Sequence, residues 1–262
     1  MSVFETILLF GGGVFAGFVN TLAGGGSFVT LSLMMLMGLD ANVANGTNRV
    51  AIIFQSLVSS ETFRAHQMLD LKKGKIPLIA TTLGSLMGAW VAVDLDKGVL
   101  EKVLALVMLA MLLFIFYKPS LWLKGNPVRY NKPSGIPEVA LFLAIGFYGG
   151  LIQAGIGYLL LAGMVLQMGF DLVKANALKV LITLVYSPVA FLVFIWHGQV
   201  SWMHALPLAA GAVAGAFFAS RMAIRRGGGF IRWVLAFMII ITSLKSFGLV
   251  DFSSLLSQVW GK

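Results

Sequence analysis

Long apolar segments recur along the whole chain, and most have the length of a bilayer-spanning helix. A helix needs roughly 20 predominantly apolar residues to cross the hydrocarbon core of a membrane. Segments that approach or reach this length extend over Ile76 to Val93, Val99 to Tyr117, Val173 to Trp196, Met203 to Ser220 and Phe230 to Leu244. Because so many occur in one chain, the pattern predicts an all-α polytopic membrane protein.

One apolar run, from Val3 to Leu39, is interrupted by the polar and glycine-rich stretch NTLAGGGS at residues 20–27. Consecutive glycines destabilise a helix, by about 1 kcal/mol each relative to alanine. The run is too long for one crossing, and its second piece, Phe28 to Leu39, is too short for a crossing of its own. We therefore expect a helical hairpin here, either re-entrant or made of two short crossings.

The same pattern occurs twice in the chain, as expected for an internal duplication. GVFAG at 13–17 resembles GFYGG at 146–150, MGLDANVANGTN at 37–48 resembles MGFDLVKANALK at 168–179, and GSLMG at 84–88 resembles GAVAG at 211–215. Each copy combines a glycine-broken hairpin with three transmembrane helices. We therefore divide the chain into a first transmembrane repeat (1–117), a linker (118–136) and a second transmembrane repeat (137–262), and call the repeats the first and second halves.

Charge predicts how the two halves lie in the membrane. Basic residues concentrate in three expected inter-helix loops, Arg64 to Lys75, Lys118 to Lys132 and Arg221 to Arg232, which the positive-inside rule assigns to the cytoplasm. Each half then makes an odd number of crossings, so the second half is inverted relative to the first, with both termini outside. Topology also explains the net charge of +9, and we expect no nucleic-acid partner for this multi-pass protein of the cytoplasmic (inner) membrane.

The two hairpin tips are the first part of the candidate substrate site. Non-helical backbone inside a bilayer must be covered by protein or must line a cavity, and a helix that begins near Ser27 would point its amides and positive dipole end at an anion. The second tip is QAGIGY at 153–158, and inversion would bring it opposite the first. The predicted tip residues are Asn20, Thr21, Gly24, Gly25, Gly26, Ser27, Gln153, Gly155, Gly157 and Tyr158. The G-x-x-x-G pairs at 13/17, 84/88, 146/150 and 211/215 instead predict close helix packing.

Polar groups in the helix that follows each hairpin are the second part of this site. Each of these helices is preceded by an aspartate, Asp40 or Asp171, which we interpret as an N-cap. The helical positions then hold Asn45, Asn48 and Arg49 in the first half and Asn176 and Lys179 in the second. Arg49 and Lys179 are candidate counter-charges for an anion; the alternative is that their side chains extend to the lipid headgroups.

Three further polar residues, Glu61, Arg64 and His66, are candidates for gating or proton coupling. Glu61 and Arg64 are spaced to form an ion pair, which favours a structural or gating role over proton transfer. The chain has no cysteine and only three histidines, so we expect no metal site, no cofactor and no catalytic site.

In its glycine-rich hairpin and the stretch that follows, the chain resembles the sulfite exporter TauE/SafE family of membrane permeases. The motifs that carry the resemblance are AGFVNTLAGGGS, NVANGTNRVAIIFQS, KGKIPLIATTLGSLMGA, GGLIQAGIGYLLLAG and KANALKV, and it extends from about residue 5 to residue 248. It implies transport of small sulfur-containing anions such as sulfite, sulfoacetate or thiosulfate. The second half departs from the family pattern, with two glycines in QAGIGY and with NALK in place of a more polar stretch.

The residues alone predict a secondary transporter that binds a small anion at the midplane, between the two halves. The alternatives are a carrier or channel for another small anion or for a cation, and a membrane-embedded enzyme. A cation would call for buried carboxylates or a histidine cluster, and an enzyme for a nucleophile and its base. The expected partners are a small anionic substrate and the lipid bilayer, and the sequence is compatible with a homodimer.

Overall fold

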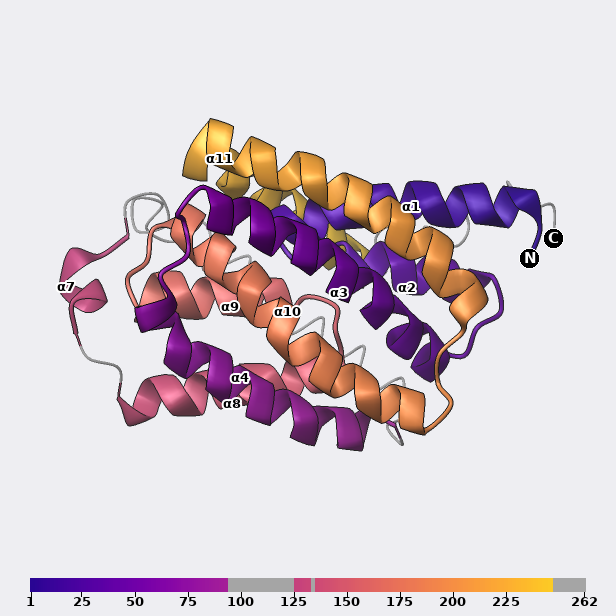
Figure 1. Ribbon diagram of the computed structural model, residues 1–262, viewed down its shortest axis with the longest axis horizontal. Coiled ribbons are helices and arrows are strands. Elements are labelled where there is room, and N and C mark those ends of the chain that lie inside the picture. Colours follow the sequence, from indigo (N-terminus) through magenta and orange to yellow (C-terminus); the bar gives the residue numbers. More distant parts are fainter. Residues whose placement is uncertain (94–124, 133–134, 247–262) are drawn as a thin grey trace.

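A computed structural model describes residues 1–93, 125–132 and 135–246, and every regular element within these ranges is helical. Helices α1 and α11 lie along one edge of the molecule and α4 and α8 along the opposite edge, while α3 and α10 cross the space between them (Figure 1). The predicted all-α class is confirmed for the described part of the chain.

The helices follow one order in the first half and a similar order in the second. The first half contains α1 (Val3–Leu22), α2 (Ser27–Leu36), α3 (Ala41–Ala65) and α4 (Leu71–Ala92). After the short α7 (Pro127–Tyr130), the second half contains α8 (Ile136–Leu151), α9 (Ile156–Ala162), the π-helix η1 (Gly163–Gln167), α10 (Leu172–Trp196) and α11 (Trp202–Ser246). The helix expected at Val99 to Tyr117 lies outside the described residues.

Four of the described helices are long and apolar enough to cross a membrane: α1, α4, α10 and the stretch Trp202–Met238 of α11. Helix α3 has a comparable length of 25 residues, but it is far more polar because of its asparagine, glutamine, serine and threonine side chains. Many of these polar side chains are buried, so α3 presents polar groups to the interior of the protein.

Both hairpins break where the sequence predicts. Helix α1 ends at Leu22 and α2 begins at Ser27, while α8 ends at Leu151 and α9 begins at Ile156. Each break contains a glycine whose backbone is left-handed, Gly24 with φ 102° and Gly155 with φ 80°. Residues with a Cβ rarely adopt this conformation. The glycines therefore let the chain reverse direction within four residues.

The basic segment Arg221 to Arg232 connects two helices, as the charge pattern predicts, but the connection is a single glycine and not an extended loop. These residues are helical on both sides of a sharp kink at Gly227, where φ is 70° and ψ is −170°. A single glycine with positive φ is enough to redirect the helix. The predicted segments Met203 to Ser220 and Phe230 to Leu244 lie on either side of this kink.

The prediction that the G-x-x-x-G pairs support close helix packing is confirmed. A Cβ added to any of these glycines would lie 1.9–2.4 Å from a backbone oxygen of the facing helix, too close for any side chain. Helix α1 packs in this way on α11, and α4 on α8. Both pairs join a helix of one half to a helix of the other.

The two interpreted N-caps differ in the structure. The Asp171 carboxylate accepts hydrogen bonds from the backbone N–H groups of Val173 (3.1 Å) and Lys174 (3.0 Å), so it caps α10 as predicted. Asp40 occupies the N-cap position of α3, but its side chain forms no cap hydrogen bond. The side-chain part of that prediction is therefore wrong for Asp40.

Candidate functional site

The two hairpin tips touch each other in the interior of the protein. A Cβ added to Gly24 would lie 2.4 Å from the Gly157 Cα atom, and one added to Gly157 would lie 2.5 Å from the Gly24 Cα atom. Backbone therefore lies against backbone, and only glycine allows this distance. The two tips, one from each half, therefore cross in close backbone contact.

A small cavity lies beside this crossing. The volume in which the centre of a water-sized molecule fits is about 20 Å³. This is room for about one water molecule. The cavity is bounded by both tips and by α3 and α10, and its lining residues are Asn20, Thr21, Gly24, Ser27, Ile52, Gln55, Ser56, Gln153, Ile156, Gly157, Lys179, Val180 and Thr183. A sulfite-sized anion enters only if these side chains or the tips move.

Lys179 supplies the single charged side chain of this lining. It is 2% exposed, and its ammonium group donates hydrogen bonds to the backbone oxygens of Asn20 and Thr21, both at 2.9 Å. An ammonium group has three donors, and no acceptor for the third is found within the described residues. These carbonyls belong to the last turn of α1, so Lys179 of the second half binds the end of a first-half helix.

Arg49 makes the reciprocal contact with the second hairpin. Its guanidinium donates to the backbone oxygens of Gly149 (3.3 Å) and Gly150 (2.6 Å) in the last turn of α8, and to the Gln153 side-chain oxygen (3.1 Å). It also lies 4.6 Å from the centre of the Phe194 ring. Arg49 is fully buried, yet it does not line the cavity.

The burial of both cations excludes the alternative that they extend to the lipid headgroups. Among the described residues no aspartate or glutamate is buried, so neither Arg49 nor Lys179 has a buried carboxylate as counter-ion there. The backbone carbonyls at the helix ends carry partial negative charge and are the acceptors for both cations.

Asn20 holds the first tip in shape. Its side-chain oxygen accepts the backbone N–H of Ser27 at 3.2 Å, and its side-chain nitrogen donates to the Ser27 hydroxyl at 3.2 Å. The Ser27 amide, which the sequence suggested for anion binding, therefore has a partner in this conformation. Gln153 holds the second tip, since its side-chain nitrogen donates to the Tyr186 hydroxyl at 2.8 Å.

About half of the predicted binding residues line the cavity, and the rest lie around it. Those in the lining are Asn20, Thr21, Gly24, Ser27, Gln153, Gly157 and Lys179, and those outside it are Gly25, Gly26, Asn45, Asn48, Arg49, Gly155, Tyr158 and Asn176. Asn45 donates to the Leu151 oxygen at 2.9 Å, and Asn48 accepts from the Thr30 hydroxyl at 2.7 Å. Both therefore fasten the hairpins in the described conformation.

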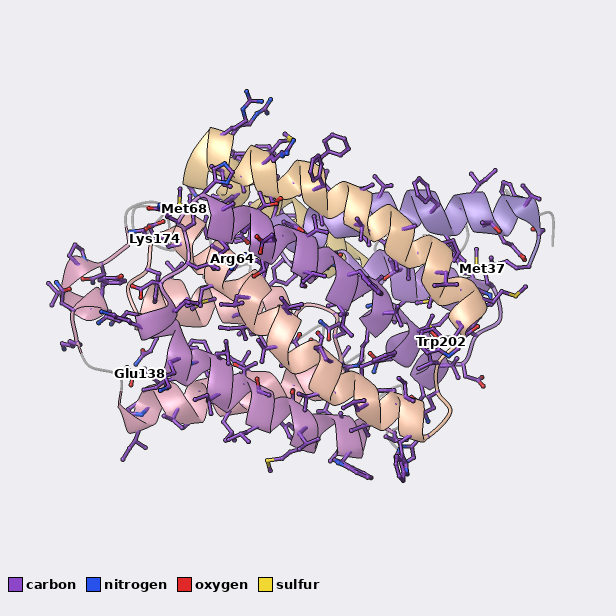
Figure 2. The ribbon with its side chains drawn as sticks, viewed as in Figure 1. Met37, Arg64, Met68, Glu138, Lys174 and Trp202 are labelled. Atoms are coloured by element: carbon purple, nitrogen blue, oxygen red, sulfur yellow. The ribbon has the colours of Figure 1, made fainter. Side chains whose placement is uncertain are left out.

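The gating and proton-coupling candidates lie far from the cavity lining, at an end of the molecule. Arg64 and Glu61 form an exposed ion pair with a nitrogen–oxygen distance of 2.8 Å, and the exposed His66 ring nitrogen lies 2.8 Å from the Thr62 oxygen. Figure 2 shows Arg64 at the same end as Met68 and Lys174, opposite Met37 and Trp202. In this conformation these residues can form a surface contact but cannot touch a substrate in the cavity.

Sequence reasoning missed six lining residues: Ile52, Gln55, Ser56, Ile156, Val180 and Thr183. Helical spacing could have found most of them, because Ile52, Gln55 and Ser56 continue the face of Asn48 by two turns. Gln55 has a further distinction, since it is 4% exposed and its side-chain oxygen has no hydrogen-bond partner among the described residues. Thr183 lies one turn after Lys179 and donates to the Lys179 backbone oxygen at 2.9 Å.

Comparison with known proteins gives consistent results. The chain is 27% identical to a probable membrane transporter protein of Haemophilus influenzae over 91% of this chain and 92% of the relative. It is equally identical to the probable membrane transporter proteins YfcA of Escherichia coli (91% and 88% of the two chains) and YunE of Bacillus subtilis (76% and 82%). No solved structure matches significantly. The sulfite exporter TauE/SafE family matches residues 9–246, and the chain is therefore a membrane transporter that belongs to this family.

Proposed function

We propose that this transporter moves small sulfur-containing anions, of the sulfite, sulfoacetate or thiosulfate type, through the cavity beside the hairpin tips. The observation that carries the proposal is the lining itself, in which Lys179 is the single charged residue and is surrounded by hydroxyl and amide groups. The family is named for sulfite export, which supports the sulfur chemistry, and the relatives' names support transport.

The chemistry of the lining suits an oxyanion. The third N–H of the Lys179 ammonium, the hydroxyl group of Ser56 and the side-chain amide of Gln55 can all donate to oxygen atoms. A cation in the same place would face the Lys179 charge without a carboxylate beside it, and like charges repel strongly in a low dielectric. The lining therefore selects an anion over a cation.

The helix pairing supports transport by relative motion of two helix pairs, each of which combines one helix from each half. Helix α1 packs on α11 as α4 packs on α8, and this reciprocity agrees with two inverted repeats. The glycine contacts make each pair tight, so the pairs move as rigid bodies. Motion between them opens the narrow cavity first to one side of the membrane and then to the other.

The test is uptake of labelled sulfite into proteoliposomes, with sulfate, thiosulfate, sulfoacetate and acetate as competitors. We expect saturable uptake that sulfur anions inhibit and acetate does not. Uptake of another anion without any uptake of sulfite would refute the sulfur assignment.

Two matched variants test the place of binding. Lys179→Met removes the charge from the cavity, whereas Lys174→Met removes a charge from the half-exposed end of the same helix, where Lys174 lies 3.8 Å from the Asp171 carboxylate. We expect Lys179→Met to abolish saturable uptake and Lys174→Met to retain it. Equal uptake by the two variants would show that the substrate does not bind next to Lys179.

A further inference from the structure

Both broken helices end on a cation that the opposite half supplies. Lys179 binds carbonyls one and two residues before the last residue of α1, Leu22, and Arg49 binds carbonyls one and two residues before the last residue of α8, Leu151. The two residues do not occupy matching positions of the repeat: the position of Lys179 is held by Asn48 in the first half. A similar contact is therefore made from two different sequence positions.

The ends of these helices need a positive partner. The last carbonyl groups of a helix have no partner within the helix, and the helix dipole places about half a negative charge there. In transporters with broken helices, the unwound carbonyls and C-terminal helix ends are the groups that coordinate a coupling cation such as Na⁺. Here both ends lie inside the protein, and both already hold a covalently attached cation.

We infer that the Lys179 ammonium takes the place of a coupling metal cation at the end of α1, so that anion transport by this protein requires no Na⁺. The inference rests on the proposed function in that it assigns Lys179 a second contact within the substrate cavity. The ammonium then has two simultaneous tasks: two N–H groups hold α1, and the third faces the anion. The same charged group therefore contacts both the end of α1 and the substrate.

The first test uses the wild-type protein and needs no substrate. We expect its melting temperature in detergent to be the same in NaCl as in choline chloride at equal ionic strength. The Lys179 ammonium already binds the carbonyls at the end of α1, so no site for Na⁺ is left there. A melting temperature that rises with Na⁺ concentration relative to choline would overturn the inference.

The second test removes the attached cation and supplies a free one. Lys179→Ala deletes three methylene groups and the ammonium, which together correspond to propylammonium. We expect propylammonium chloride to raise the melting temperature of Lys179→Ala relative to choline chloride. The matched variant Lys179→Met fills the same space without charge and should gain nothing. Equal responses of the two variants would overturn the inference.

The third test separates this inference from the proposed function. Proteoliposomes are loaded so that Na⁺ or choline is the main cation, and sulfite uptake is measured under both conditions. Equal uptake supports both proposals, and uptake only with a Na⁺ gradient overturns the inference alone. If sulfite is not transported, the proposed function fails, while the two unfolding experiments still decide the role of Lys179.

Discussion

The contact between the hairpin tips can be tested at a single residue, Gly24. Replacement by alanine has two costs, because Gly24 has a φ of 102° and because its Cβ would lie 2.4 Å from the Gly157 Cα atom. An L-residue in left-handed backbone loses about 1–2 kcal/mol, and overpacking of a tight contact costs about 1–3 kcal/mol. We expect Gly24→Ala to lower the free energy of unfolding by about 2–5 kcal/mol in total.

A second glycine isolates the part of this loss that the contact causes. Gly38, at the end of α2, has a φ of 90° and nothing within 4 Å of the added Cβ, so Gly38→Ala has the backbone cost alone. The free energy of unfolding should therefore differ between the two variants by the cost of overpacking the tip contact, about 1–3 kcal/mol.

The assay is reversible unfolding in detergent of the wild type and both variants, accompanied by sulfite uptake in proteoliposomes. We expect Gly24→Ala to lose both stability and uptake, and Gly38→Ala to lose less stability and keep uptake. If both variants lose the same stability, then the tips are not in contact and the reasoning is refuted.

Two further predictions concern charged and polar contacts outside the cavity. Arg49→Met should destabilise the protein by about 1–3 kcal/mol, because it leaves buried acceptors without a donor, while Arg64→Met, which breaks only an exposed pair, should leave unfolding unchanged; similar losses would refute the role of Arg49. The second contact lies at the start of α4, where the Tyr130 hydroxyl donates to the Asp70 carboxylate and raises the pKa of Tyr130 to about 12. Because the folded-state pKa is raised, this stabilisation is complete below about pH 10 and is lost as pH rises towards 12. Wild type should therefore be more stable than Tyr130→Phe at pH 8 in thermal unfolding, and a difference that persists unchanged above pH 12 would contradict the assignment.

The sequence predicts the fold well because its strongest signals are local. The NTLAGGGS stretch, the apolar run of α10 and the spacing of Gly13 and Gly17 each report a physical requirement that can be read within a few residues. The kink at Gly227 was missed because a basic segment between two apolar ones is typical of a loop. The distribution of charge does not distinguish a helical segment from a loop.

The candidate site was predicted less completely because it depends on distance in space. Spacing placed Arg49 and Lys179 inside the protein, but it could not show that each binds the end of a broken helix from the other half. Nor could it separate Lys179, which lines the cavity, from Arg49, which does not. Asn20 was expected to bind the substrate, and only the folded tip reveals that its side chain is already bonded to Ser27.

The pairing of α1 with α11 has a consequence for how the protein is made. The glycine face of α1 has its partner in the opposite half, and 179 residues lie between Leu22 and Trp202. Helix α1 is therefore synthesised well before α11 and has no partner for its glycine face until α11 has been inserted. Neither half can complete its own packing, and two halves expressed as separate chains should assemble into one transporter only when they are produced together.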